Sequence, residues 1–488
     1  MRQSRTTLFL LLFCAVLFFL ALGNHQLQGS TEPRVAGIAM EMHLDHDWVT
    51  PRVNGQPFLE KPPLSLWLDV TAMRLFGPTE LAVRLASALA GLGCVMVLYG
   101  MLRYLGRSAA MALLAGLMLA TMASYWGNVR QVGEDALLCL GVSLALLSFL
   151  RAHLHERGDS PGWPLFALGI AIASLSKGLL GLALPGVVVF AFLLVETWQQ
   201  RRFRLEAWLT PFAWTLLGVL PLLFWLGALY NQQGLEGLRE ILWANSVGRF
   251  SGSFTEAGHY EAWYYYLGKL PEAFLPWNLL TYLGLWHLRK RVRDDRQLLF
   301  FYVWMAAQFL LLTLASSKRM VYLMSLSPPA AVIAAEYAGI WLARWRERGL
   351  PVRNLQVGVF AVLLLAYLGV GYRVQPRADR KESLQSLVTQ IQARQAQGQD
   401  VMLYQPSERL AGATVFYSRS RLPALNDQDE LLQFLRQSPG HVAIMESLST
   451  PPPPLKVLEK QVVGKRAYYV LGIDRETDLS TTSVIKQN

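Results

Sequence analysis

The sequence predicts an α-helical membrane protein with many spans, followed by a soluble domain. Two observations predict this class. Of the 488 residues, 53% are apolar and only 16% are charged, whereas soluble globular proteins carry about a quarter charged residues. The shortage of charge is concentrated in the first three quarters of the chain, where long apolar runs alternate with short charged segments.

The apolar runs predict eleven spans, or up to thirteen, because each is long enough to cross about 30 Å of hydrocarbon at about 1.5 Å per residue. The run at 7–23 follows a basic N-terminus and is expected to be a retained first span, since no convincing small-residue cleavage site follows it. Residues 163–197 are expected to form two short spans, with a break at Ser176, Lys177 and Gly178. The other spans are expected at 81–102, 109–127, 135–151, 208–230, 266–287, 298–315, 320–342 and 354–373.

Basic residues occupy every second connection between these spans, at 2–5, 103–107, 151–157, 201–204, 289–296 and 344–353. The positive-inside rule therefore places the N-terminus in the cytoplasm and the C-terminal domain outside it. The net charge of +11 comes mostly from these basic connections, which set the orientation in the membrane, so no nucleic-acid partner is expected. Cys14, Cys94 and Cys139 fall within expected spans, which argues against a disulfide framework or a Cys-rich zinc site.

The predicted domains are a membrane domain, 1–373, and a periplasmic α/β domain, 374–488. Long outer loops interrupt the membrane domain at 23–80 and 231–265. Apolar residues between 35 and 42 recur at helical spacing and predict an amphipathic helix along the membrane surface. In the second domain, helices are expected at 384–397, 410–417 and 430–436, and strands at 401–404, 441–445 and 467–471.

The first outer loop carries an acid–base pair, Glu60-Lys61, directly before Pro62 and Pro63. Prolines restrict their own backbone and that of the preceding residue, so the pair could be held in a fixed direction. The alternative is a solvated turn before the next span. In the second loop, His259 could join Glu60 in binding a metal, or it could be an ordinary interfacial residue.

Several cations are expected near the outer boundary of the membrane. Such side chains often extend to lipid headgroups without a further role. Together, however, they could collect a phosphate group and stabilise its departure. These features favour a membrane enzyme or a transporter with an outer anionic site, and they leave both open. The cations are Arg34, Lys61, Lys177, Arg249, Lys318 and Arg319.

A family resemblance favours the enzyme. Three segments of the first loop, Glu32-Pro-Arg-Val-Ala-Gly-Ile-Ala, Asp47-Trp-Val-Thr-Pro-Arg-Val-Asn-Gly and Phe58-Leu-Glu-Lys-Pro-Pro-Leu, resemble the first periplasmic loop of the bacterial aminoarabinose transferases. These belong with the protein mannosyltransferase-like enzymes of the GT-C fold. The likeness continues in order to about residue 345. It covers Arg130, Asp135, Ser176-Lys-Gly, Arg249-Phe, Leu275-Pro-Trp and Ser317-Lys-Arg-Met-Val-Tyr.

The resemblance implies a glycosyltransferase of the bacterial inner membrane. It would transfer a sugar from polyprenyl (undecaprenyl) phosphate to an envelope acceptor on the periplasmic side. The best-known members modify lipid A in lipopolysaccharide, but another glycan or a protein could be the acceptor. The expected partners are therefore the lipid-linked donor, the acceptor and membrane lipid.

The resemblance also implies roles for single residues. Glu60 and His259 match positions that hold a zinc ion, and Lys61 matches the lysine that faces the carrier phosphate. Lys318 and Tyr322 match a later phosphate-side pair. Arg249 is a further candidate for binding the donor phosphate.

The two residues that open the first-loop motif differ from those usual in the family. An Asp-Glu pair usually precedes the motif arginine, which is Arg34 here, but this chain has Thr31-Glu32. Either Glu32 takes the acidic catalytic role or the chain uses another arrangement. An acceptor that is already an anionic phosphate would need little base catalysis.

Two other classes stay open at this point. A flippase or transporter of lipid-linked sugars would be expected to show inverted repeats with paired broken helices. The sequence has one such break, at 176–178, and no evident partner for it. A non-catalytic scaffold would leave the Glu-Lys-Pro-Pro motif unexplained.

The charge pattern predicts which loops face outward. Cysteines introduced at Gln56, Gly258 and Gln399 are expected to react with a membrane-impermeant thiol reagent in intact cells whose outer membrane is permeabilised. Mass-tagging of the purified protein measures the labelled fraction. Labelling that appears only after lysis of the inner membrane would reverse the topology.

Overall fold

The computed structural model describes the chain except residues 1, 155–160, 254–258, 450, 453 and 475–488. The proposed label at Gly258 lies outside the described residues. The described chain divides into two compact units. The first comprises Met1–Leu22, Leu59–Ser65 and Arg84–Gly369, and the second comprises Gly23–Phe58, Leu66–Val83 and Val370–Asn488. Most of the first long loop therefore groups with the C-terminal part of the chain.

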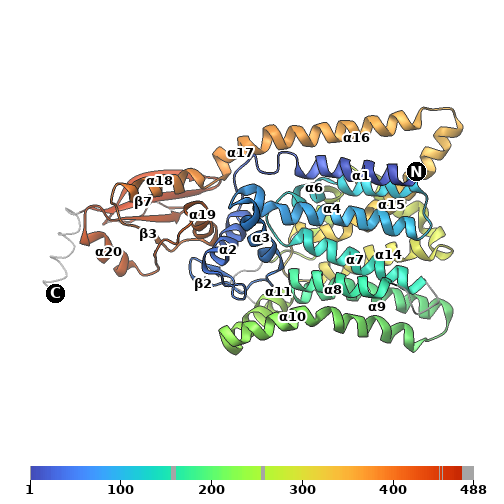
Figure 1. The fold of residues 1–488 in the computed structure, drawn as a ribbon, viewed down its shortest axis with the longest axis horizontal. Coiled ribbons are helices and arrows are strands. Elements are labelled where there is room, and N and C mark those ends of the chain that lie inside the picture. The colour runs from blue at the N-terminus through green and yellow to red at the C-terminus, as the bar shows by residue number, and fades with distance from the viewer. Residues whose placement is uncertain (1, 155–160, 254–258, 450, 453, 475–488) are drawn as a thin grey trace. The chain divides into compact units, whose positions relative to one another are not determined.

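The first unit is a helical bundle, which confirms the predicted fold class (Figure 1). Seven helical segments of the described chain are long and apolar enough to span a membrane, or eight if a bent pair is counted as one span. Two shorter apolar helices, α1 (Arg2–Phe19) and α8 (Gly162–Lys177), accompany them. The long segments contain α4 (Glu80–Tyr104), α7 (Asp135–Leu154), α9 (Leu179–Gln200), α10 (Leu205–Arg239) with η1 (Glu240–Gly248) and α11 (Arg249–Ser251), α14 (Arg296–Leu314), η3 (Met320–Leu326) with α15 (Ser327–Glu347), and α16 (Val352–Gly369).

Two of the spans expected to be continuous are bent or broken. The bent pair is α5 (Ala109–Ala120) and α6 (Ala123–Val129), whose axes differ by 67°. The expected span at 266–287 is instead two short helices, α12 (Tyr265–Ala273) and α13 (Asn278–His287), followed by η2 (Leu288–Arg293). Pro276 lies between the two short helices, where a missing backbone N–H and a fixed φ oppose a continuous helix.

The predicted break at Ser176–Gly178 is present and joins α8 to α9. Gly178 has φ +57°, a left-handed conformation that glycine adopts without steric cost. The two helices then run back close together, because a Cβ at Gly181 would lie 2.0 Å from the carbonyl oxygen of Ala173. Small residues allow this approach between membrane helices. Helices α7, α8 and α9 consequently lie side by side (Figure 1).

A buried arginine closes the end of the first helix. The Arg130 side chain is 1% exposed, and its guanidinium donates to the carbonyl oxygens of Phe18 and Leu20 at 2.8 Å and of Ala21 at 2.9 Å. Carbonyls at a helix C-terminus lack partners within the helix and carry partial negative charge. Arg130 therefore ties the end of α1 to the chain that follows α6.

The second unit contains a five-stranded sheet with the strand order β4-β3-β5-β7-β6. Strand β3 pairs in parallel with β4 and β5, whereas β7 pairs antiparallel with β5 and β6. The helices and strands predicted beyond residue 374 are confirmed, and the helix α17 and the strands β4 and β6 were missed. The strands are β3 (Val401–Tyr404), β4 (Ala424–Leu425), β5 (Val442–Ser447), β6 (Leu455–Val463) and β7 (Arg466–Ile473), with the hairpin β1 (Arg52–Val53) and β2 (Gln56–Pro57). The helices are α2 (Thr31–Asp45), α3 (Leu64–Phe76, mostly in this unit), η4 (Val370–Val374), α17 (Gln375–Glu382), α18 (Gln385–Ala396), α19 (Glu408–Ser418) and α20 (Gln428–Gln437).

Helix α2 forms where the first loop was expected to be helical, but its environment differs from the expectation. A Cβ at Gly37 would lie 2.3 Å from the Cα of Gly412 in α19, so the two helix backbones touch. Val35, Ile38 and Met42 are at most 7% exposed. Its apolar face is therefore buried against protein and does not face lipid, and the position of α2 along the membrane surface stays a prediction.

Candidate active site

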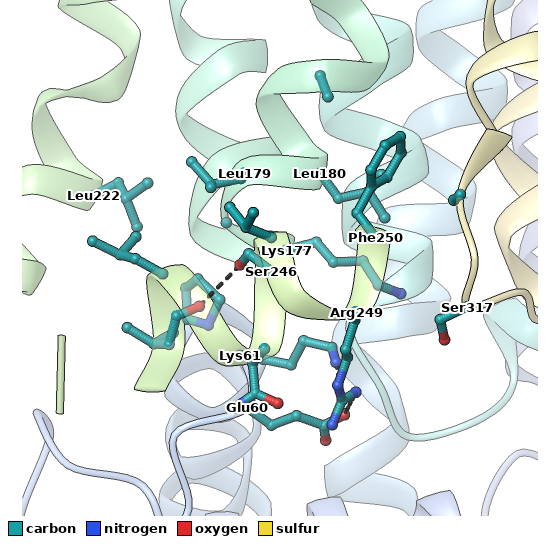
Figure 2. Close-up of a pocket in the computed structure, with 18 of the residues that line it drawn as sticks. Glu60, Lys61, Lys177, Leu179, Leu180, Leu222, Ser246, Arg249, Phe250 and Ser317 are labelled. Carbon is teal, nitrogen blue, oxygen red and sulfur yellow. Dashed lines mark hydrogen bonds and ion pairs between the residues drawn. The ribbon is translucent and has the colours of Figure 1, made fainter. Parts of the chain in front are cut away.

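A cavity of about 320 Å³ in the first unit has charged side chains on one side and apolar side chains on the other. Figure 2 shows Glu60, Lys61 and Arg249 close together, with Leu179 and Leu222 on the far side of the cavity. Helices α9, α10 and α14 supply most of the apolar wall, which includes Leu179, Leu180, Ala183, Leu222, Trp225, Leu226, Leu311 and Leu312.

The carboxylate of Glu60 is shared by two cations. Its Oε1 accepts a hydrogen bond from Lys61 Nζ at 2.9 Å and a second from Arg249 Nη1. The Glu60 side chain is only 9% exposed, so these charge-assisted contacts lie in a partly dehydrated environment, where they are stronger than in water. The cluster carries one excess positive charge.

The segment around Lys61 is held from two directions. Asn245 Nδ2 donates to the carbonyl oxygen of Leu59 at 3.0 Å. On the other side, a Cβ at Gly178 would lie 3.6 Å from Pro62, so the proline packs against the helix break. With Glu60 mostly buried, the structure matches the fixed acid–base pair and not a solvated turn.

A second charged cluster adjoins the first and is more deeply buried. Lys177 Nζ lies 3.2 Å from a carboxylate oxygen of Glu134 and also contacts Asp135. The ammonium lies 4.7 Å from the ring centre of Tyr322, a cation–π contact. The Lys177 side chain is 3% exposed, and burying such a charge is tolerable only when it is paired. The sequence reasoning did not identify Glu134, although the acidic pair directly before an apolar run was a usable signal.

The pKa of Glu134 reports the strength of this cluster. Burial raises that pKa, but Lys177 and then Lys61 outweigh it and hold the pKa at about 2. Because this is below the value of about 4.3 in an unfolded chain, the ionised form stabilises the fold above that pH. The contribution is lost as the pH falls toward 2.

Lys318 and Tyr322, predicted to act together, have different surroundings. Tyr322 lines the cavity, as does Ser317, but Lys318 is not among the described lining residues. Lys318 is 4% exposed, and its Nζ donates to the carbonyl oxygens of Glu261 and Ala315. Burial lowers the pKa of Lys318, which Glu261 partly counteracts.

The predicted metal ligands do not form a complete metal shell by themselves. The described residues contain no group of three or more His, Cys, Asp or Glu side chains placed to hold an ion. Glu60 already bears two cations. His259 is exposed, and its carbonyl oxygen accepts from the backbone N–H of Lys318 at 2.8 Å. A metal bound by Glu60 and His259 stays a prediction that requires further ligands.

The remaining predicted residues, Glu32 and Arg34, belong to the second unit. Glu32 is 4% exposed, and its Oε2 accepts from the backbone N–H of Gln28 at 3.0 Å. Arg34 pairs with Glu408 at 2.8 Å and lies over the ring of Phe58 at 5.5 Å. Their predicted catalytic roles stay predictions.

Comparisons with known sequences support the resemblance carried by the motifs. The profile of the dolichyl-phosphate-mannose-protein mannosyltransferase family matches residues 60–225. An undecaprenyl phosphate-alpha-4-amino-4-deoxy-L-arabinose arabinosyl transferase of Pseudomonas aeruginosa is 29% identical over 380 residues, covering 75% of this chain and 66% of that protein. The Aeromonas salmonicida protein of the same name is 29% identical over 367 residues, covering 74% and 64%. The match thus spans slightly less than two thirds of these relatives.

Solved structures establish the fold. ArnT from Cupriavidus metallidurans bound to undecaprenyl phosphate superposes with a TM-score of 0.72 at 21% identity, covering 95% of this chain and 97% of that one. The archaeal oligosaccharyltransferase AglB from Archaeoglobus fulgidus, in complex with an inhibitory peptide and a dolichol-phosphate, gives 0.59 at 13% identity, covering 91% and 69%. The predicted GT-C fold and the resemblance to the aminoarabinose transferases are confirmed.

The buried cluster predicts a charge-specific stability effect. Lys177→Met is expected to destabilise the protein by about 3–5 kcal/mol, because it leaves the buried carboxylate of Glu134 and the partly buried one of Asp135 without their main cation. Adding Glu134→Gln and Asp135→Asn to Lys177→Met is expected to restore much of the loss. Thermal unfolding of the purified proteins measures both effects.

The matched control is Lys269→Met, since Lys269 pairs with Glu272 on the surface and both are well exposed. Its effect is expected to stay below about 1 kcal/mol. Equal stability of the Lys177 and Lys269 variants would contradict the account of the buried cluster.

Proposed function

We propose that this chain, a relative of the undecaprenyl phosphate–aminoarabinose transferases with the GT-C fold, transfers a sugar from a polyprenyl-phosphate donor to an envelope acceptor. One observation carries the proposal. The cavity combines a cationic side with a wall of apolar side chains from membrane-spanning helices. That combination suits a ligand with an anionic phosphate directly attached to a long hydrocarbon.

The donor phosphate would bind beside Lys61 and Arg249. Both cations are held by Glu60, so they are in position before the ligand arrives and need little rearrangement. The isoprenoid would lie along the apolar wall, where burial of hydrocarbon contributes about 25 cal/mol per Å². Tyr322 and Lys177 border the same cavity, and Tyr322 is proposed as a further phosphate-side group.

The transfer step makes a specific demand on these residues. The acceptor oxygen forms a bond to the anomeric carbon while the bond from that carbon to the phosphate oxygen breaks. Negative charge grows on the departing polyprenyl phosphate, so a cation beside it binds the transition state more strongly than the ground state. Lys61 is proposed as the main contributor.

The proton of the acceptor requires a separate group. Glu32 is the proposed base for a hydroxyl acceptor, with Arg34 as its neighbour in the motif. For an acceptor that is an anionic phosphate, as on lipid A, no base is required. Lipid A is the proposed acceptor, on the strength of the likeness to aminoarabinose transferases.

The proposed location is the bacterial inner membrane, with the cavity and the second unit facing the periplasm. The chain is a multi-span membrane protein. The orientation rests on the basic segments of the predicted inner connections and on the positive-inside rule.

Lys61→Ala is expected to lower the rate of sugar transfer by roughly 100-fold or more, because a charge that stabilises the transition state is lost. Lys61→Arg is expected to keep part of the activity, since the charge remains but the shape of the group differs. Purified protein, an undecaprenyl-phosphate aminoarabinose donor and lipid A provide the assay.

The control for this test is Lys269→Ala, which removes an exposed lysine from the same unit. It is expected to transfer at the wild-type rate. All variants are first checked for unchanged thermal unfolding and a single species in solution. Near wild-type transfer by Lys61→Ala would contradict the phosphate-binding role.

We also propose that Glu60 and His259 bind a divalent ion, with zinc the best match to a carboxylate and an imidazole. Substrate or water would complete its shell. Elemental analysis of purified protein is expected to find bound zinc that decreases in His259→Ala but not in His287→Ala, a second exposed histidine. Unchanged metal content in His259→Ala would remove this pair as the ligands.

A further inference from the structure

A second cavity, of about 680 Å³, lies at the opposite ends of the helices that border the first. Helices α7 and α9 begin near the first cavity and end at the second, where His153 and Glu196 line the wall. Helices α8 and α10 begin at the second cavity, with Trp163 and Trp208. The two cavities therefore share helices, and no described residue lines both.

An ionic cluster around the buried Glu196 forms one wall of the second cavity. The Glu196 residue is 7% exposed. Its carboxylate accepts from His153 Nε2 and, on the other oxygen, from Arg296 Nε at 2.9 Å and Arg296 Nη2. The cluster joins α7, α9 and the start of α14. Because His153 and Arg296 already donate to both carboxylate oxygens of Glu196, the other cations that line the cavity can contact a ligand.

Two of these cations come from the connection between α9 and α10. Arg202 and Arg204 line the cavity and are exposed. Neither forms an ion pair within the parts of the chain that the structure describes. Among the described lining residues, the arginines are Arg202, Arg204 and Arg296. Glu196 holds Arg296, so the exposed Arg202 and Arg204 can contact an anionic headgroup.

The surroundings of the cavity are those of a membrane–water interface. Trp163, Trp208 and Trp214 line it, and tryptophan is enriched at headgroup depth. The neighbouring outer surface is apolar, with Trp198 79% and Phe203 66% exposed. In a membrane-spanning bundle such a surface faces lipid, so a headgroup could enter the cavity while its acyl chains stay outside.

We infer that the second cavity binds the phosphate of a phospholipid headgroup, with Arg202 and Arg204 as its main ligands. Guanidinium groups bind phosphate oxygens through paired hydrogen bonds, and basic pockets at the ends of membrane helices suit anionic headgroups. The positive-inside rule explains why arginines occur in this connection. It does not explain why two of them line a cavity with three tryptophans. This inference does not depend on the proposed transferase activity.

The test compares two charge-matched double variants. Arg202→Ala/Arg204→Ala removes the proposed ligands, whereas Lys290→Ala/Arg293→Ala removes two exposed cations of η2 that do not line the cavity. Delipidated full-length protein in an uncharged detergent is titrated with phosphatidylglycerol, and native mass spectrometry measures the bound fraction. The Arg202/Arg204 variant is expected to bind roughly tenfold more weakly or worse, and the Lys290/Arg293 variant like the wild type.

Two further ligands test whether the cavity needs a phosphate group and whether that phosphate must belong to a lipid. Diacylglycerol with the same acyl chains lacks the phosphate and is expected not to bind. Inorganic phosphate is expected not to displace phosphatidylglycerol, because it lacks the chains that reach the surrounding lipid. Displacement at millimolar phosphate would overturn a lipid headgroup as the occupant.

A second double variant of the same two arginines controls for a folding defect. Arg202→Lys/Arg204→Lys keeps both charges and is expected to bind phosphatidylglycerol with intermediate affinity. Equal affinity of the wild type and of both cavity variants would overturn the site. Thermal unfolding without lipid verifies that each variant is folded before it is titrated.

Discussion

The candidate active site depends on burying the ammonium of Lys177 at a helix break. An unpaired ammonium in this environment would be prohibitively costly, so carboxylates must be brought to it. Glu134 and Asp135 supply them from the start of α7. Tyr322 covers the ammonium from η3, and Pro62 packs against the same break at Gly178. One buried charge thereby fixes three helical elements and the motif segment around one cavity.

The sharing of Glu60 has a related consequence for ligand binding. Lys61 and Arg249 would repel each other without a carboxylate between them, and Glu60 relieves this repulsion. In the proposed function, an entering phosphate would meet cations that are already ordered and still carry excess charge. The two side chains lose their conformational entropy when the protein folds and not when the ligand binds. This favours both higher affinity and a fixed orientation of the ligand.

The sequence predicted those features that depend on local chemistry. The break at Ser176–Gly178 was predictable because a charge and a glycine interrupt an apolar run, and the restraint on Lys61 because two prolines follow it. Glu134 was not singled out, since an acid at the start of a helix is ordinary and only the fold brings it to Lys177. The different surroundings of Lys318 and Tyr322 likewise depend on how the chain packs after α14.

Predictions for the second unit failed for features that depend on tertiary packing. Strand β6 alternates exposed and half-buried residues and carries Lys456, Glu459 and Lys460, so its weak apolar pattern resembles a loop. The helical spacing in α2 was read correctly, but a sequence pattern cannot say whether protein or lipid covers an apolar face. Gly37, which has no side chain to signal a contact, is one of the positions at which α2 touches α19.

The contact between α2 and α19 also imposes an order on the synthesis of the protein. Arg34 and Glu408, which form an ion pair across these helices, are 374 residues apart in the chain. At about 5–20 residues per second, a ribosome needs roughly 20 to 75 seconds to make the second helix after the first. Throughout that interval α2 exists without its partner, and its apolar residues are open to other proteins. The second unit is thus a late product of translation, although its first helix is among the earliest segments made.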